Sequence, residues 1–252
     1  FDERVPEEIN RKIVDHLSDI NFVLTEHARR YLIAEGLPQE RIIKSGSHML
    51  EVLNHFKKKI NNSKILNKLK QKNKKYFLLS VHREENVDDS VNLKKIIDIM
   101  NQLVKIYKIP IIVSTHPRTK KRLEKINKEI NSKILFLKPF GFFDYVHLQK
   151  NALCVISDSG TITEEASILK FPAVTIRNTH ERPEGMDEGI VVMTGLKVKN
   201  VLNAIHLVID MAKRNIKFEI INDYNANNVS KKIIKCIFSY IDYVNINVWK
   251  KN

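Results

Sequence analysis

The sequence has 252 residues, of which 43% are hydrophobic and 29% are charged. This composition is typical of a folded globular protein with one large domain or two modest ones. Lysine and arginine outnumber aspartate and glutamate, which gives a formal net charge of +14. The basic runs, such as Lys57-Lys58-Lys59, lack the interleaved aromatic residues of a nucleic-acid platform. We therefore expect an anionic small-molecule ligand and no nucleic-acid partner.

The sequence also lacks the usual signals for membranes and secretion. No apolar run approaches the length of a membrane span, and Phe1-Asp2-Glu3-Arg4 does not begin a signal peptide. Cys154 and Cys236 are the only cysteines, one in a predicted strand and one in a predicted helix. We expect both to be core thiols of a cytoplasmic protein that does not insert into a membrane.

Predicted strands and helices alternate along nearly the whole chain. Apolar runs predict strands over Asn21–Leu24, Arg41–Lys44, Tyr76–Val81, Ile109–Thr115, Ile134–Leu137, Leu153–Ser157, Ala173–Ile176 and Ile190–Met193. Helical periodicity predicts helices over Glu7–Asp19, Glu26–Glu35, Leu93–Lys105, Thr119–Glu129, Asp144–Lys150, Ile162–Leu169, Val198–Lys213 and Val229–Tyr240. The alternation predicts an α/β fold with a Rossmann-like, doubly wound parallel sheet.

Composition also predicts where the domains divide. The lysine- and asparagine-rich residues 57–75 indicate a linker region, and residues 76–225 hold enough strands for a complete Rossmann-like domain. Residues 1–56 hold too few strands for a parallel sheet covered on both faces. We expect them to be the tail of an incomplete N-terminal Rossmann-like domain. A C-terminal helix in residues 226–252 is expected to pack back on that domain.

The most informative motif follows the strand over Leu153–Ser157. Asp158-Ser159-Gly160-Thr161 makes a tight turn that opens a helix, with Glu164 and Glu165 in its first turn. Backbone N–H groups at a helix start bind anions, and Arg177 follows the next strand, at the same edge of the sheet. The same residues also suit a plain capped helix with carboxylates near its positive end. The turn alone does not decide between the two.

Two further strand ends lead to the same edge. Tyr76–Val81 continues into His82-Arg83-Glu84-Glu85-Asn86, and Ile109–Thr115 continues into His116-Pro117-Arg118. Histidine and arginine together at the ends of two strands favour an active site. The nine histidines show no metal-ligand spacing, so we expect no metal.

In their order along the chain, these motifs resemble the non-hydrolysing UDP-N-acetylglucosamine 2-epimerase family. The resemblance also rests on Pro6-Glu7-Glu8-Ile9-Asn10-Arg11, Thr25-Glu26, Ser45-Gly46 and Glu181-Arg182-Pro183-Glu184. Most of the family has a second glycine where this chain has Thr161. That variant and the chain's ending are similar to the branch that makes UDP-N-acetyl-L-fucosamine from UDP-N-acetyl-L-pneumosamine.

The resemblance implies the C-terminal part of a two-domain, glycosyltransferase-B-like fold. It implies C2 epimerisation of a UDP-2-acetamido sugar by elimination and re-addition of UDP, for capsule or O-antigen biosynthesis, without a cofactor. Such a route needs carboxylate acid–base groups and positive charge at the departing pyrophosphate.

The resemblance also assigns roles to individual residues. Glu7 is implied in acid–base chemistry, and His82 is implied beside the leaving pyrophosphate. Contacts with the substrate or with UDP are implied for Arg83, His116, Tyr145, Ser159, Gly160, Thr161, Glu165 and Arg182. Within that set, the turn would hold phosphate, Glu165 the ribose hydroxyls and Tyr145 the uracil. Arg83 and His116 match positions that bind an allosteric UDP-N-acetylglucosamine in some members.

Three motifs of the family's N-terminal half do not occur in this sequence: an Arg-Pro-Glu loop, Gly-Asp-Thr and His-x-Glu-Ala-Gly. We therefore expect the chain alone to bind UDP but not to epimerise efficiently. Expected partners are a UDP-sugar and a second copy in a homodimer of the complete enzyme. Two explanations of the missing motifs stay open: the chain is a fragment or split-gene product, or it complements a separate N-terminal polypeptide. Two alternatives stay open: a UDP-sugar glycosyltransferase of the same architecture, and a non-catalytic UDP-sugar-binding fragment.

Overall fold

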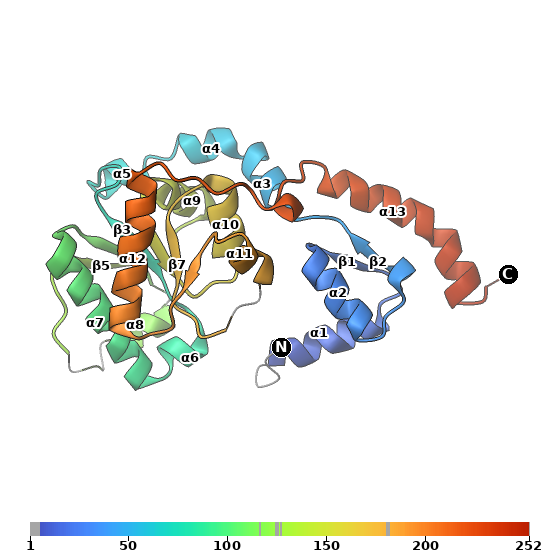
Figure 1. Ribbon diagram of the computed structural model, residues 1–252, viewed down its shortest axis with the longest axis horizontal. Coiled ribbons are helices and arrows are strands. Elements are labelled where there is room, and N and C mark those ends of the chain that lie inside the picture. Colours follow the sequence, from blue (N-terminus) through green and yellow to red (C-terminus); the bar gives the residue numbers. More distant parts are fainter. Residues whose placement is uncertain (1–5, 116, 124–125, 127, 180–181, 252) are drawn as a thin grey trace. The chain divides into compact units, whose positions relative to one another are not determined.

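The protein divides into two compact units in a computed structural model that describes residues 6–115, 117–123, 126, 128–179 and 182–251 (Figure 1). Unit 1 comprises residues 1–55 and 220–252, and unit 2 comprises residues 56–219.

Unit 2 is built on a parallel sheet, in which the described residues form six strands in the order β5-β4-β3-β6-β7-β8. Their bounds are Phe77–Ser80 (β3), Ile111–Ser114 (β4), Ile134–Leu137 (β5), Cys154–Ser157 (β6), Ala173–Thr175 (β7) and Val192–Met193 (β8). This is the Rossmann order, so the predicted doubly wound sheet is confirmed for this unit. The strand order reverses between β3 and β6, and such sheets bind ligands at the carboxyl ends of the two strands beside the reversal.

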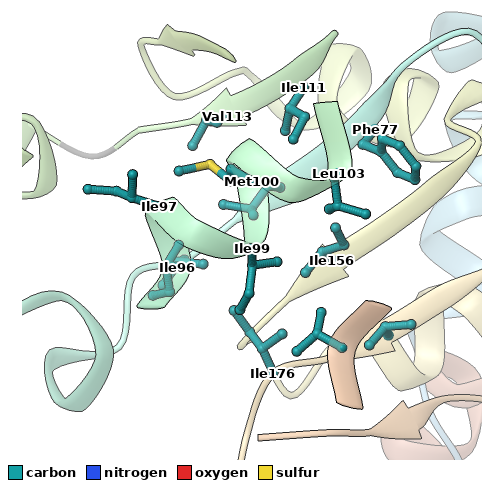
Figure 2. Close-up of a cluster of buried hydrophobic side chains, with 14 of the residues drawn as sticks. Phe77, Ile96, Ile97, Ile99, Met100, Leu103, Ile111, Val113, Ile156 and Ile176 are labelled. Carbon is teal, nitrogen blue, oxygen red and sulfur yellow. The ribbon is translucent and has the colours of Figure 1, made fainter. Parts of the chain in front are cut away.

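Alternate residues of each strand pack into separate apolar layers on the two faces of this sheet. Phe77 and Leu79 contact the layer that includes α7 (Ser90–Tyr107) and α12 (Val198–Lys213), whereas Leu78 contacts the layer that includes α9 (Phe142–Asn151) and α10 (Ile162–Leu169). Figure 2 shows the first layer, where Leu103 and Met100 of α7 lie against Ile111 and Ile156 of the strands. Because both faces are covered, the strands are largely apolar, and β3, β4, β6 and β7 each end in a serine or threonine.

Short helices complete unit 2. They are α4 (Lys57–Asn61), α5 (Ile65–Lys68), α6 (Glu84–Val87), α8 (Pro117–Leu123) and α11 (Pro183–Asp187). Residues 57–75, expected to be a linker, instead contain α4 and α5, which pack on α9 and bury Ile60 and Ile65. Because these helices carry many polar side chains, composition alone does not predict that Ile60 and Ile65 anchor them in the core.

Unit 1 holds a small parallel sheet. Its elements are α1 (Pro6–Leu17), β1 (Asn21–Val23), α2 (Glu26–Ala34), a 3-10 turn (Gln39–Arg41), β2 (Ile42–Lys44), α3 (Met49–His55), a 3-10 turn (Asn222–Tyr224), α13 (Val229–Tyr243) and a π-helical turn (Val244–Val248). In the described part of unit 1, β1 and β2 pair parallel, and α2 packs on them through Val23, Leu32, Leu37 and Ile42.

The C-terminal residues join this sheet through polar contacts. The Asp223 carboxylate accepts hydrogen bonds from the Lys44 Nζ and from the backbone N–H of Glu26, both at 2.8 Å. The Lys232 Nζ donates to the Ser45 carbonyl at 2.7 Å. Gly46 lies between these contacts with a φ of 86°, and a Cβ there would approach the Ala226 side chain to 2.9 Å. Glycine is therefore required where the two chain segments meet.

Two helices of unit 1 expose apolar side chains. On α1 these are Ile9, Ile13, Val14 and Leu17, and on α13 they are Ile234, Ile237, Phe238 and Ile241. The spacing of three and four residues places each group on one helix face. No helix in the described part of the chain is long and apolar enough to cross a membrane.

The core of unit 2 yields a first prediction. Leu103 is fully buried in α7, whereas Ile106 of the same helix is exposed. We expect Leu103→Ala to lower the free energy of unfolding by about 3 kcal/mol, because it removes buried methyl groups and leaves a cavity. Ile106→Ala should change it by less than about 0.5 kcal/mol. Urea denaturation followed by circular dichroism measures both, and equal effects would contradict this packing.

Candidate functional site

A pocket of about 240 Å³ opens at the carboxyl edge of the sheet in unit 2. The ends of β3, β4 and β6, the start of α9 and the turn before α10 form its walls. Its lining residues are Ser80, His82, Ser114, Phe140, Phe142, Tyr145, Ser157, Ser159, Thr161 and Glu165. Five residues singled out in the sequence, His82, Tyr145, Ser159, Thr161 and Glu165, thus share one pocket beside the reversal of strand order.

Unit 1 has a larger hollow of about 520 Å³, which is a weaker candidate. Its two lysines, Lys44 and Lys232, already bind Asp223 and the Ser45 carbonyl. The hollow therefore lacks a concentration of positive charge for an anion, and four of its nine lining residues are asparagines.

The turn before α10 has the geometry of an anion site. The Ser159 Oγ lies 3.0 Å from the Thr161 Oγ1, and the Ser159 N–H donates to the Ser157 Oγ at 3.1 Å. Thr161 is the N-cap residue of α10, yet its side chain makes no capping hydrogen bond. The Thr161 N–H donates to the Ser159 Oγ at 3.4 Å, but the Thr161 side chain does not cap the N–H groups that follow, which favours the anion-binding interpretation over plain capping.

Glu165 and its neighbours make one wall of the pocket. Glu165 is 9% exposed and accepts a hydrogen bond of 2.5 Å from the Gln149 side chain. Burial raises the pKa of Glu165 to about 7, against the opposing effect of hydrogen bonds from Gln149 and Thr161. Burial, with the nearby charge of Glu165, also raises the pKa of Tyr145 above its ordinary value. The wall therefore offers a phenol donor beside a carboxyl that changes charge near neutrality.

Asp158 joins the ends of β3 and β6. Its side chain is fully buried and accepts hydrogen bonds from the backbone N–H groups of His82 at 3.2 Å and Arg83 at 3.0 Å, and from the Asn86 amide at 3.0 Å. The Arg83 Nε donates in turn to the Asp158 carbonyl at 3.1 Å. Asp158 was considered in the sequence only as part of the turn. Asp158 has this second role because β3 and β6 are neighbours in the sheet, so that their ends meet.

Arg182 lies outside the pocket lining. It forms an ion pair of 2.9 Å with Glu164, which is buried in the first turn of α10. Just beyond, Gly185 lies so close to Thr163 that a Cβ would overlap its methyl group. The pair and the close approach hold α11 against α10.

Other predicted residues have other positions. Gly160 and Arg83 are next to lining residues without being among them. His116 is outside the described residues. Glu7 belongs to the first turn of α1 in unit 1, and its side chain is not among those described. Its part in the chemistry stays a prediction.

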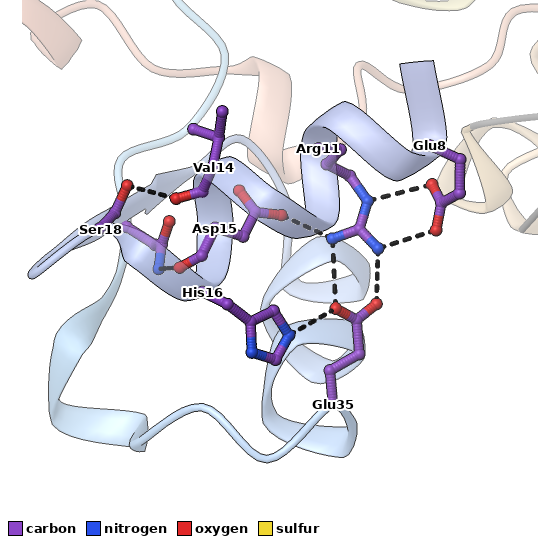
Figure 3. A network of polar contacts seen from close by, with 8 residues as sticks. Glu8, Arg11, Val14, Asp15, His16, Ser18 and Glu35 are labelled. Carbon is purple, nitrogen blue, oxygen red and sulfur yellow. Dashed lines mark hydrogen bonds and ion pairs between the residues drawn. The ribbon is translucent and has the colours of Figure 1, made fainter. Parts of the chain in front are cut away.

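The residues after Glu7 hold α1 in place (Figure 3). The Arg11 guanidinium donates to Glu8 at 2.8 and 3.1 Å, to Glu35 of the α2 end at 2.6 Å and to Asp15 at 2.5 Å. These carboxylates raise the pKa of Arg11, and Arg11 lowers the pKa of Glu8. Glu8 and Arg11 therefore serve structure, so Glu7 is the carboxylate of this motif that remains a candidate for chemistry.

Among the residues that the structure describes, no group of three or more histidine, cysteine, aspartate or glutamate side chains could hold a metal ion.

The raised pKa of Glu165 yields a second prediction. Folding raises the pKa from its ordinary 4.5 to about 7, so the folded state holds the proton more tightly than the unfolded state. Stability contributed by this group is present below pH 4.5, falls as the pH rises, and is lost above about 7. Above that pH, the ionised carboxyl lowers the free energy of unfolding by on the order of 3 kcal/mol relative to its protonated form.

Glu165→Gln cannot ionise, so its stability relative to the parent should increase from pH 5 to pH 8, across the pKa of about 7. Urea denaturation at both pH values measures this. Glu188→Gln, at an exposed position, is the control and should show no such trend. A constant difference between Glu165→Gln and the parent would show that Glu165 does not titrate in this range.

Known proteins resemble this chain over most of its length. The sequence model of the UDP-N-acetylglucosamine 2-epimerase family matches residues 1–238. The UDP-N-acetylglucosamine 2-epimerase of Methanocaldococcus jannaschii is 35% identical over 250 residues, which cover 96% of this chain and 67% of that protein. A Methanococcus maripaludis protein of the same name is 36% identical, covering 94% and 66%. The chain thus spans about two thirds of the length of these curated relatives.

Solved structures agree with this result. A UDP-N-acetylglucosamine 2-epimerase from Rickettsia bellii aligns with a TM-score of 0.91 and 54% identity, covering 100% of this chain and 67% of that one. The Methanocaldococcus jannaschii protein in complex with UDP-GlcNAc and UDP aligns with a TM-score of 0.85 and 33% identity, covering 95% and 66%. These alignments confirm the predicted fold class, a parallel α/β architecture of the glycosyltransferase-B type. With 238 of its 252 residues matched, the chain belongs to the UDP-N-acetylglucosamine 2-epimerase family.

Proposed function

We propose that this chain provides the UDP-holding part of an enzyme that epimerises a UDP-2-acetamido sugar at C2. The observation that carries the proposal is the pocket that unites the uncapped start of α10 with His82, Tyr145 and Glu165. Helix N–H groups and a histidine suit a diphosphate, whereas a carboxylate and a phenol suit a ribose and a base. The M. jannaschii relative was solved with UDP-GlcNAc and UDP.

The chemistry of this reaction explains why a leaving-group site is needed. The C2 hydrogen of the sugar has no adjacent carbonyl, so direct deprotonation is difficult. Removing that proton while the C1–O bond to UDP breaks gives a planar 2-acetamidoglycal and free UDP. UDP then adds back at C1 as a proton reaches C2 from the opposite face. Positive charge and N–H donors at the departing diphosphate stabilise the transition state of both steps.

The proposal assigns roles to several pocket residues and to other residues of the motifs. The Ser159-Gly160-Thr161 turn holds the diphosphate, and His82 stands beside it. Glu165 accepts hydrogen bonds from the ribose hydroxyls, and Tyr145 contacts the uracil. Arg182 reaches the sugar nucleotide by exchanging its ion pair with Glu164 for a phosphate. Glu7 shares in the acid–base chemistry.

Several finer proposals rest on the family resemblance. The substrate is UDP-N-acetyl-L-pneumosamine, which the reaction converts to UDP-N-acetyl-L-fucosamine for capsule or O-antigen synthesis in the cytoplasm. Arg83 and His116 contribute to a second, regulatory UDP-sugar site. UDP-N-acetylglucosamine, the substrate in the names of the relatives, is the other substrate to be tested.

A further proposal concerns unit 1. A parallel sheet needs cover on both faces and more than two strands for stability. The described part of unit 1 has β1 and β2 only, while α1 and α13 expose apolar faces. We propose that these faces pack against a polypeptide segment that adds parallel strands and carries the family's Gly-Asp-Thr and His-x-Glu-Ala-Gly motifs. The completed enzyme is proposed to be a homodimer.

Isotope labelling tests the reaction. The 252-residue chain is mixed with an N-terminal polypeptide of the family that carries both motifs, and UDP-N-acetylglucosamine or UDP-N-acetyl-L-pneumosamine is added in deuterated water. We expect deuterium at C2 and the C2 epimer as product from the mixture. The chain alone should bind UDP with little turnover, because it lacks the partner's carboxylates.

A matched pair of variants sharpens this test. His82→Ala should abolish labelling in the mixture, whereas His206→Ala, on α12, should not affect it. Sugar transfer to an acceptor without label at C2 would instead indicate a glycosyltransferase. UDP binding without label in any mixture would indicate a non-catalytic binding protein.

Calorimetry with two ligands tests the assignment of Glu165. Glu165→Ala should weaken UDP binding roughly tenfold, because charge-assisted hydrogen bonds to the ribose are lost. Pyrophosphate has no ribose, so its affinity should not change. If the affinities for UDP and pyrophosphate fell equally, Glu165 would stabilise the turn that binds phosphate instead of contacting the ribose.

A further inference from the structure

We infer that Asp158 is a positioning residue for His82: it holds the proton on Nδ1 and so presents Nε2 to the pocket. The inference deepens the proposed function, on which it rests, by naming the group that orients the histidine beside the diphosphate. It concerns a contact between the ends of β3 and β6, on the two sides of the reversal of strand order.

The contact itself is direct. The His82 Nδ1 lies 3.2 Å from the Asp158 Oδ1. The histidine side chain is 54% exposed and lines the pocket, whereas the aspartate side chain is fully buried. One ring nitrogen therefore faces a buried carboxylate, and the exposed part of the ring is available to a ligand.

The surroundings of Asp158 determine which nitrogen carries the proton. Its carboxylate already accepts from the backbone N–H groups of His82 and Arg83 and from the Asn86 amide. Each of these N–H donors needs an acceptor, and a carboxylate, which can only accept hydrogen bonds, supplies one to all three. The ring nitrogen that faces it must then be the donor. Nδ1 carries the proton, and Nε2 is free to meet the ligand.

This arrangement has a chemical consequence for the proposed reaction. A buried carboxylate on Nδ1 fixes the tautomer and the ring orientation of a histidine and stabilises its protonated form. Once protonated, the Nε2–H of His82 points into the pocket, where it donates to an oxygen of the departing diphosphate. Since Asp158 also binds the backbone of residues 82 and 83, the same carboxylate fixes both the loop and the ring.

Nitrogen NMR of the whole chain tests the inference without requiring turnover. In ¹⁵N-labelled protein at mildly alkaline pH, long-range imidazole correlations report which ring nitrogen of His82 is protonated. His82→Gln identifies the signal. We expect the proton on Nδ1 in the parent. In Asp158→Asn an amide donor can face Nδ1, so the proton should move to Nε2.

Asn86→Ala is the matched control, since it removes a partner of the Asp158 Oδ2 but does not touch the ring. It should leave the tautomer unchanged. A parent ring protonated on Nε2 would overturn the inference, and this measurement holds even if Asp158→Asn fails to fold. An unchanged tautomer in a folded Asp158→Asn would overturn it as well.

Pyrophosphate binding adds a functional readout. Asp158→Asn should weaken it roughly tenfold, because a neutral ring with its proton on Nε2 donates less strongly than an imidazolium. If the expected tautomer is found but no deuterium label appears at C2 in the complemented enzyme, the positioning role stands and the proposed reaction fails. If the ring carries its proton on Nε2 but deuterium appears normally at C2, the proposed reaction stands and the positioning role fails.

Discussion

A buried carboxylate at the end of β6 determines how the carboxyl edge of unit 2 is organised. Without Asp158, the N–H groups of His82 and Arg83 and the Asn86 amide would lose an acceptor inside the protein, and each unmet donor costs on the order of 1–3 kcal/mol. With it, the loop after β3 is attached to the turn before α10. The two loops beside the reversal of strand order therefore behave as one wall, and the pocket is formed before a ligand arrives.

The pocket combines groups whose charges suit different parts of one ligand. The start of α10 carries partial positive charge from the helix dipole. In the first turn of the same helix, Glu165 is buried deeply enough to remain partly protonated near neutral pH, beside a neutral Tyr145. The pocket thus joins N–H donors that suit charged phosphates to a carboxyl and a phenol that suit the neutral hydroxyls and base of a nucleoside diphosphate.

Much of this could be predicted from the sequence, and the reasons for the remainder are physical. Strands such as Phe77–Ser80 and Cys154–Ser157 are buried on both faces, so their apolar runs are visible in the sequence. The helices α4 and α5 were missed because Ile60 and Ile65 find their partners on α9, far along the chain. The grouping of His82, Ser159 and Glu165 followed from strand ends meeting at one edge. The pairing of Arg182 with Glu164 depends on side-chain direction, which a one-dimensional pattern does not contain.

The position of Trp249 provides a means to observe unit 1 separately. It is the only tryptophan in the chain, and its indole N–H donates to Asp19 at 3.1 Å within unit 1. The residue is otherwise 60% exposed. Its fluorescence therefore comes from unit 1 alone, and unit 2 contributes only tyrosine emission. Burial of the ring would shift the emission to shorter wavelength, so an optical signal native to the protein separates events in the two units without any label.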